Sequence, residues 1–230
     1  MNTFILSPSD FAFGFDQCKK CYFNKIVNKL ILKTGFPSVF SKFDRCQKHY
    51  YSNKSAKLIS EDLDEGTIHT KDSDKLMVSK KLYDNKKRPF ILRGKLDAYI
   101  HHYTNNFYSV IDFKTTDMKT EKAHMYSNQL HSYALMLENP SKNDVIAPVK
   151  RLGLFCFYPE KQTGHSNNSS NYKLETKWIE IERNDNKFYH YITSILDLLH
   201  GDVKDEGNPA CTTCNFINSA VKRKEYQIGR

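Results

Sequence analysis

Long hydrophobic segments are absent from this 230-residue sequence, and no run reaches the roughly 18 apolar residues that a membrane-spanning helix needs. Residues 1–8 also lack the basic and long apolar segments of a secretory signal. Internal repeats and domain linkers are missing as well. We therefore expect a cytoplasmic protein with no membrane partner, built as a single domain over residues 1–230.

Arginine is scarce among the 35 basic residues, although the formal net charge is +9. Such a charge suits a polyanionic partner, because lysine and arginine neutralise phosphates. The lysines are scattered along the chain, and the bidentate reading of bases favours arginine. The composition therefore favours contact with a nucleic-acid backbone over recognition of a base sequence.

Helical periodicity dominates the first part of the chain, residues 1–63. Ser7 and Pro8 suit the N-cap and first position of a helix. Apolar residues then recur at three- and four-residue steps from Phe11 to Leu30. We predict an opening helix over 7–30, a second helix over 39–51 and a third helical segment over 55–63. Residues 64–87 are expected to be a polar surface segment with weak strand potential at 76–78.

The periodicity changes to two at Phe90, which indicates strands. Residues 88–182 are predicted to form the main sheet with its helix, and residues 186–230 a C-terminal helix and cysteine pair. The order of elements predicts an α/β fold with a mixed central β-sheet flanked by helices. The expected strands cover 90–100, 108–114, 152–158 and 172–181, and the expected helices cover 121–137 and 186–199.

Two aspartates, Asp97 and Asp112, stand in otherwise apolar strands, where a charge needs a partner or a metal. Because side chains alternate along a strand, Lys114 shares the face of Asp112, whereas Phe113 offers only its carbonyl there. Two carboxylates and a carbonyl suit Mg²⁺ or Mn²⁺, which can activate water and take up charge on a phosphodiester. The ammonium of Lys114 would stabilise a phosphate oxygen.

A surface ion pair is the simplest alternative for Asp112 and Lys114, and such a pair is worth less than about 1 kcal/mol. The tripeptide acid-x-Lys also occurs at five other places in the chain. Only the copy at Asp112 ends an apolar strand, follows a strand with a second aspartate, and precedes a helix with a polar stripe. This context favours a catalytic site.

The six cysteines divide into two pairs and two isolated residues. Cys18 and Cys21 form one C-x-x-C pair, and Cys211 and Cys214 form another near the opposite end of the chain. Two such pairs in a reducing compartment indicate a tetrathiolate site for zinc or an iron–sulfur cluster, and we expect the chain ends to meet there. The isolated residues, Cys46 and Cys156, are expected to be core thiols.

Three stretches resemble motifs of the PD-(D/E)XK nuclease superfamily, in its RecB-like branch. They are Gly94-Lys95-Leu96-Asp97, Asp112-Phe113-Lys114-Thr115 and Gln129-Leu130-His131-Ser132-Tyr133. The resemblance covers most of the chain and implies a restriction-endonuclease-like core. It also implies metal-ligand roles for Asp97 and Asp112 and a catalytic role for Lys114.

Gln129 and Tyr133 match the Q-x-x-x-Y motif of the same family. The resemblance implies that this motif positions the catalytic lysine or contacts DNA. A place in the helix core is the alternative for Tyr133.

The cysteine pairs extend the resemblance to AddB-type nuclease domains and to a CRISPR-associated nuclease. In those relatives one cysteine before the core and three after it hold a [4Fe–4S] cluster. Here the arrangement is two plus two, which keeps four ligands and leaves Zn²⁺ as the alternative. Either metal is expected to clamp the chain ends and to take no part in the reaction.

Many RecB-like nucleases carry a further histidine or acidic residue, called motif I, on an early helix. This sequence shows no Gly-x-x-x-His pattern at which to place it. The candidates are His49, Glu61, Glu65 and His69.

Together these features predict a metal-dependent DNA nuclease that acts on single strands or DNA ends, in repair, recombination or phage-related processing. Exonuclease and endonuclease action both stay open. One alternative is a catalytically weak or inactive nucleic-acid-binding protein. Another is a subunit of a larger recombination complex with a helicase-like partner. A third is a sequence-specific endonuclease, which the scarcity of arginine disfavours.

Overall fold

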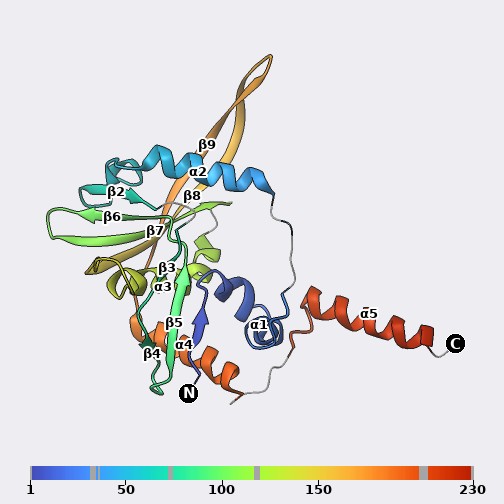
Figure 1. Cartoon of the computed structure of the whole chain (residues 1–230). Coiled ribbons are helices and arrows are strands. Elements are labelled where there is room, and N and C mark those ends of the chain that lie inside the picture. The colour runs from blue at the N-terminus through green and yellow to red at the C-terminus, as the bar shows by residue number, and fades with distance from the viewer. Residues whose placement is uncertain are drawn as a thin grey trace.

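The computed structural model describes residues 2–31, 35, 37–71, 75–116, 120–201 and 207–228. The chain forms a mixed α/β fold in which two mixed β-sheets are flanked by helices (Figure 1). This confirms the predicted fold class, and it adds a second, smaller sheet that the sequence did not indicate. Among the described residues, no helix is long and apolar enough to span a membrane.

The larger sheet has five strands in the order β2-β6-β7-β8-β9. β7 and β8 run parallel, and the other neighbours are antiparallel. The strands predicted over 90–100 and 108–114 include β6 and β7, and these two strands are antiparallel neighbours. The strands are β2 (Gly66–Thr70), β6 (Ala98–His102), β7 (Phe107–Thr115), β8 (Val149–Ser166) and β9 (Ser169–Ile181).

The smaller sheet is built around β5, which pairs in parallel with β1 and antiparallel with β3 and β4. Residues 64–87 therefore contribute three strands. The weak strand potential at 76–78 is confirmed by β3, whereas the prediction of a surface segment was wrong. Ile68 and Leu82 are buried in the other two strands, which are too short to give a strand pattern. The strands are β1 (Phe4–Leu6), β3 (Met77–Val78), β4 (Leu82–Tyr83) and β5 (Pro89–Gly94).

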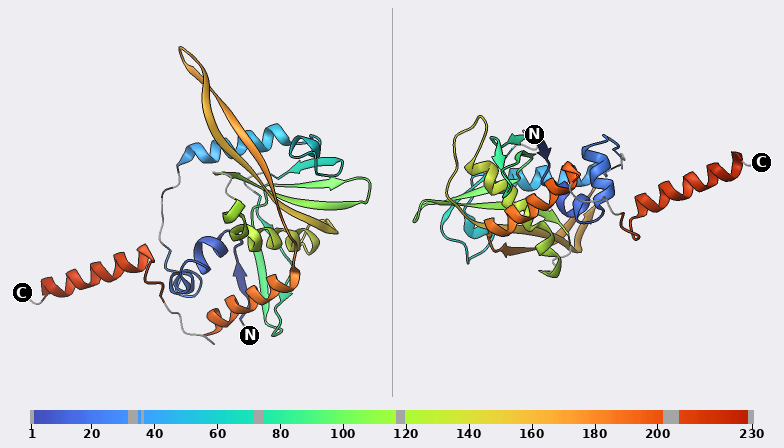
Figure 2. Two further views of the ribbon diagram at one scale, coloured as in Figure 1. Left: turned by 180° about the vertical axis from the view of Figure 1, so that it is seen from behind. Right: turned by 90° about the horizontal axis from the view of Figure 1, so that it is seen from below.

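Strands β8 and β9 are much longer than β7, whose pairing with β8 ends at Thr115 and Phe157. Beyond that point β8 pairs with β9 as a two-stranded ribbon, and the ribbon projects from the body of the protein (Figures 1 and 2). Tyr158 and Tyr172 on the ribbon are exposed. The ribbon thus continues the sheet outward from the end of β7.

Three predicted helices are confirmed, at 39–51, 121–137 and 186–199, although the 121–137 segment begins as a 3₁₀ turn. The single opening helix was wrong, because Cys18 adopts an extended backbone (φ −160°) and separates two short helical segments. The predicted segment over 55–63 is only a short 3₁₀ turn, and the helix α5 was not predicted. The helical elements are η1 (Phe11–Phe15), α1 (Lys19–Ile26), α2 (Ser38–Tyr51), η2 (Ala56–Leu58), η3 (Thr120–Tyr126), α3 (Ser127–Glu138), α4 (Asp185–His200) and α5 (Thr212–Ile228).

Side-chain alternation along β7 divides the core into two clusters, one on each face of the sheet. Val110 belongs to the cluster formed with α3 and α4, whereas Ile111 and Phe113 belong to the cluster beneath α2. Asp112 and Lys114 alternate with these residues, so they face α3. The same alternation that fills both cores therefore fixes the direction of the functional side chains.

The predicted strand over 90–100 is interrupted. β5 ends at Gly94, β6 begins at Ala98, and the intervening residues up to Asp97 are not in a strand. The two halves belong to different sheets. Asp97 is therefore in a short connection between the sheets, and not within a continuous strand as expected.

Phe155 provides a test of the core beneath α2, since it is fully buried and its ring meets those of Tyr51, Phe113 and Phe157. We expect Phe155→Ala to lower the free energy of unfolding by about 3–5 kcal/mol, because it leaves a cavity among rigid rings. Urea unfolding followed by circular dichroism measures this change. Phe216→Ala is the control, because this ring is 73% exposed and its loss should cost no more than about 0.5 kcal/mol. Equal losses in the two variants would contradict the assignment of this core.

Candidate active site and metal centre

Asp97 links three elements at the break between the two sheets. Its Oδ2 accepts a hydrogen bond of 2.9 Å from the backbone N–H of Phe113 on β7. Its Oδ1 lies 2.7 Å from the ammonium of Lys48 on α2. The carboxylate is therefore held against the end of β7, beside Asp112.

Phe113 lies between the two acidic positions, and its ring points away from them into the cluster beneath α2. The ring packs edge-on against Tyr51 and Phe155. Only its backbone is left on the side of the carboxylates, in agreement with the alternation along β7. Its carbonyl as a metal ligand stays a prediction.

The carboxylate of Asp112 is buried, at 2% exposure, and its Oδ2 lies 2.5 Å from the ammonium of Lys114. Burial raises the pKa of Asp112 to about 7; Lys114 opposes this rise, and Asp97 adds to it. Burial would lower the pKa of Lys114, but the neighbouring Asp112 outweighs this effect and raises it. Lys114 therefore stays charged, while the ionised form of Asp112 is only partly compensated by its neighbours.

Helix α3 contributes Gln129 and Tyr133 to the same place. The side-chain amide of Gln129 donates to Oδ1 of Asp112 at 3.3 Å and to the hydroxyl of Tyr133 at 3.0 Å. Tyr133 is also a buried member of the main core, as the alternative interpretation of this residue expected. In the structure this motif contacts the buried aspartate, whereas the resemblance implied that it positions the lysine or contacts DNA.

The glycine at the end of β5 is required by close packing. A Cβ atom on Gly94 would lie 3.0 Å from Cδ of Pro8 and 3.3 Å from Cε1 of Tyr133. A larger residue would therefore require Pro8 or Tyr133 to shift by a few tenths of an ångström. This explains why a glycine stands three residues before Asp97.

Helix α2 supplies two residues that sequence reasoning missed, Asp44 and Lys48. The ammonium of Lys48 is 2.9 Å from Asp44 and 2.7 Å from Asp97, and the residue is only 8% exposed. Burial would lower the pKa of Lys48, but Asp97 and Asp44 outweigh it and raise the pKa. The i,i+4 spacing of Asp44 and Lys48 on the predicted helix was the available signal, although such pairs are usually solvated.

The four candidates for motif I lie elsewhere. His49 is exposed on α2, and Glu61 and Glu65 are exposed beyond it. His69 lies on β2 and stacks on Tyr99, with 5.0 Å between ring centroids. None of the four lines the cavity that contains Asp97 and Asp112.

A cavity of about 950 Å³ lies among the side chains of Lys48, Asp97, Asp112, Lys114 and Gln129. Acidic and amide groups lie together with several cations, so the cavity has a mixed charge that can accept both a metal and a phosphate. Its polar lining includes Asp44, Arg45, Lys48, Arg93, Lys95, Asp97, Asp112, Lys114 and Gln129.

The donor set of this cavity fits a hard divalent cation. The neighbouring carboxylates of Asp97 and Asp112 supply oxygen, and Mg²⁺ commonly binds through one or two carboxylates plus waters. Oδ2 of Asp112 is buried, and its close polar neighbour is the ammonium of Lys114 at 2.5 Å. A cation at this point would compensate the remaining charge of Asp112.

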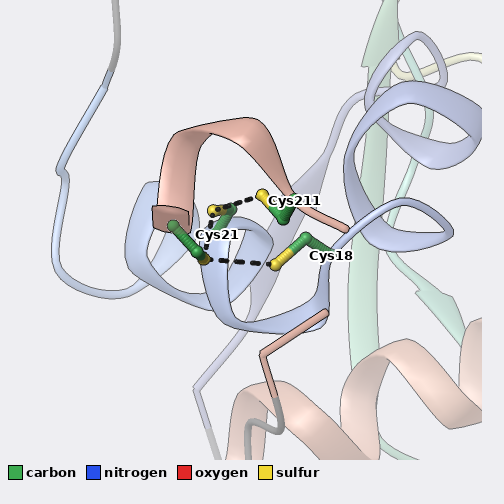
Figure 3. A group of neighbouring side chains, drawn as sticks. Cys18, Cys21 and Cys211 are labelled. Carbon is green, nitrogen blue, oxygen red and sulfur yellow. Dashed lines mark hydrogen bonds between the residues drawn. The ribbon is translucent and has the colours of Figure 1, made fainter. Parts of the chain in front are cut away.

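The four paired cysteines meet at a second centre, as predicted (Figure 3). Their sulfur atoms all lie within 4.8 Å of one another. Cys18 precedes α1 and Cys211 precedes α5, whereas Cys21 and Cys214 lie in the first turns of these helices. The side chain of Asn208 also donates to the carbonyl of Gln17 at 2.7 Å, which ties the two segments together.

The thiols differ in how readily they ionise. Burial raises the pKa of Cys18, but hydrogen bonds from the backbone of Asn208 and Cys21 outweigh it and lower the pKa to about 7. Burial raises the pKa of Cys21. The centre therefore has a thiol that is ready to bind a metal as thiolate. Of the isolated cysteines, Cys156 is buried as predicted, and the prediction for Cys46 was wrong because it is exposed on α2.

Comparison with known proteins gives one match to a family. The family model of the PD-(D/E)XK nuclease superfamily matches residues 71–219, a range that includes both aspartates, Lys114 and the second cysteine pair. No curated protein matches the chain. The crystal structure of SSO0001 aligns over 86% of this chain and 78% of its own chain, with a TM-score of 0.46 and 10% sequence identity. At this TM-score the likeness carries no argument.

Lys48 provides a test of the charge arrangement in the cavity. We expect Lys48→Met in chelator-containing buffer to lower the free energy of unfolding by about 3 kcal/mol, because Asp97 and Asp44 lose a buried cation. Chemical denaturation measures the loss.

Lys86→Met is the matched control for this variant. Its ammonium also lies 2.7 Å from an aspartate, Asp197, but its side chain is 54% exposed. The expected cost is below about 1 kcal/mol. A loss in Lys48→Met no larger than that of the control would show that the buried pair is not formed.

Proposed function

This chain belongs to the PD-(D/E)XK nuclease superfamily, and from that premise we propose that it is a DNA nuclease that hydrolyses phosphodiester bonds with Mg²⁺ or Mn²⁺. The observation that carries the proposal is the meeting of Asp97, Asp112 and Lys114 in one cavity. We further propose that residues 1–230 act as one nuclease domain in the cytoplasm. The RecB-like branch remains our assignment from the sequence motifs.

In this proposal Asp97 and Asp112 bind the divalent cation, with the carbonyl of Phe113 as a further ligand. When bound, the cation supplies an activated water and takes up negative charge that develops on the phosphate. Lys114 holds a phosphate oxygen or orients the attacking water, since its ammonium lies on the same face as Asp112. Its raised pKa keeps it charged for this role.

Gln129 and Tyr133 act as positioning residues for Asp112. The amide of Gln129 is shared between the carboxylate and the Tyr133 hydroxyl, so it limits the rotation of Asp112. Tyr133 in turn is fixed by its burial and by its contact with Gly94. A ligand carboxylate that is held in one orientation loses less entropy when a cation binds.

The substrate proposal rests on charge and on cavity size. Arg45, Arg93 and Lys95 line the cavity together with the carboxylates, and the chain as a whole carries a formal charge of +9. A cavity of about 950 Å³ accommodates more than a single phosphate group. We therefore propose a single strand or a DNA end as substrate, in repair, recombination or phage-related processing.

One observation favours a second function. Lys48 forms ion pairs with Asp97 and Asp44 inside the cavity. A cation bound by Asp97 has to compete with this ammonium. The second candidate is therefore a nucleic-acid-binding subunit with weak or no catalysis, which acts with a helicase-like partner in a recombination complex.

Asp112→Asn tests the nuclease proposal, because it removes one negative charge and keeps the shape of the side chain. We expect it to slow Mn²⁺-dependent cleavage of end-labelled single-stranded DNA by at least about a hundredfold, since each lost 1.36 kcal/mol of barrier reduction is about tenfold in rate. Lys114→Ala and Asp97→Ala should have losses of the same order. Chelation of the metal should abolish cleavage by the unaltered protein.

Lys177→Ala is the control, because Glu175-Thr176-Lys177 is another acid-x-Lys tripeptide and lies on an exposed part of β9. It should leave cleavage unchanged. Unchanged activity in Asp112→Asn would overturn the assignment of the site. Absence of cleavage by the unaltered protein on single-stranded, double-stranded and RNA substrates, together with retained binding, would support the second candidate.

A further inference from the structure

The spacing of the four sulfur atoms decides what kind of metal group they can hold. Three of the distances are 3.6 Å between Cys18 and Cys214, 3.6 Å between Cys21 and Cys211, and 3.4 Å between Cys21 and Cys214. All four atoms lie within 4.8 Å of one another. They therefore form a compact group of four donors with space for one small ion between them.

A single tetrahedral ion requires this spacing. Zinc–sulfur bonds are about 2.3 Å long, so the sulfurs of a tetrahedral tetrathiolate site lie about 3.8 Å apart. The three distances above differ from this value by only a few tenths of an ångström. The donor set is also the one that structural zinc sites use, four cysteines arranged as two C-x-x-C pairs.

A [4Fe–4S] cluster requires a wider site. Each cysteine then binds a different iron, and the iron and sulfide atoms of the cluster lie between the cysteine sulfurs, which places them at roughly 6 Å from one another. In this structure no pair of the four sulfurs is farther apart than 4.8 Å. To hold a cluster, the two helix starts would have to separate.

Two disulfides also fail to account for the arrangement. Cys21 lies at nearly equal distance from Cys211 and Cys214, so it has no preferred single partner. A disulfide would bring one pair to about 2 Å and leave the others apart. Four donors that all lie within 4.8 Å of one another indicate a shared central ligand.

We propose that the four cysteines bind one zinc ion, in place of the [4Fe–4S] cluster that the family resemblance implies, and that this ion fastens the start of α5 to α1. The proposal does not depend on the nuclease activity, since the centre lies outside the cavity of Asp97 and Asp112.

The position of α5 shows what the ion would do for the fold. The helix points away from the body of the protein in all views (Figures 1 and 2). Phe216, Ile217 and Val221 on its surface are 73%, 52% and 51% exposed, so apolar packing does not hold this stretch of the helix. Its first turn is tied to the N-terminal segment by the cysteines and by the hydrogen bond from Asn208 to Gln17. Binding of the ion would thus replace the packing that α5 lacks.

The segment on the other side of the ion continues into the main core. Tyr22, in α1, is buried and packs edge-on against Phe15, which in turn meets Tyr191 of α4. Cys18 is itself buried beside them. The zinc ion would therefore connect α5 to a rigid part of the protein rather than to another exposed segment.

Anaerobic purification followed by metal analysis tests the proposal directly. We expect about one zinc per chain, no acid-labile sulfide, and no absorption near about 400 nm, where iron–sulfur clusters absorb. Iron and sulfide in equal amounts with absorption in that region would overturn the proposal. A metal-free protein, or one with disulfides between these cysteines, would also overturn it.

Two cysteine variants show whether the bound zinc depends on the four-cysteine centre or on another thiol. Cys214→Ser should lose the zinc and expose α5 to limited proteolysis, whereas Cys46→Ser, at an exposed cysteine outside the centre, should keep about one zinc per chain. If Cys214→Ser fails to fold, replacement of the ion in the unaltered protein by Co²⁺ gives the answer, because a tetrahedral thiolate site makes the protein coloured through its thiolate–Co²⁺ absorption. Zinc retention in Cys214→Ser, or a colourless Co²⁺-exchanged protein, would contradict the proposal.

Nuclease assays on the same samples keep the two proposals apart. An inactive protein with about one zinc would contradict the nuclease proposal alone. An active protein with iron and sulfide would contradict the zinc proposal alone.

Discussion

The burial of one carboxylate, that of Asp112, is the constraint on which the candidate active site depends. A charge that water does not reach has to be compensated locally, and here Lys114, Gln129 and the nearby cavity share that task. Each of these neighbours is fixed by an element of the fold: Lys114 by alternation along β7, and Gln129 by its place on α3. Because compensation is incomplete, burial still raises the pKa of Asp112. A folded protein that retains such a group has a position where binding of a cation is favourable.

Much of this site was predictable from local sequence, and the limits have physical causes. Asp97, Asp112 and Lys114 were found because charges rarely interrupt apolar strands, and the C-x-x-C pairs because few other roles require four thiols at that spacing. The break at Asp97 was missed because residues 90–100 alternate without a turn signal, and only pairing with two different sheets separates β5 from β6. Lys48 was missed because its ion-pair partner Asp97 lies far away along the chain. The opening helix was wrong because helical periodicity does not record the extended backbone of Cys18.

The two candidate sites differ in how the fold and the site stabilise each other. The cavity brings together residues from α2, β7 and α3 around groups that are costly to bury, so the fold stabilises an arrangement that would not form alone. At the cysteine centre the site would instead stabilise the fold, because apolar packing does little to hold α5 there. The cavity is therefore organised by charge compensation. The cysteine centre is organised by four thiols that suit the binding of one metal ion.

The ribbon formed by the outer parts of β8 and β9 has a dynamic consequence. Up to Phe157, β8 is held between β7 and β9, whereas beyond it the strand has one neighbour, and the register with β9 shifts twice near Pro159 and Gln162. Two-stranded ribbons are marginally stable in water, so this part opens by local unfolding at a much lower free energy than β7 does. Amide hydrogens in the ribbon should then exchange with solvent within a time in which those of β7 stay protected. A single strand thus passes from rigid to mobile at the residue where it loses β7 as a neighbour.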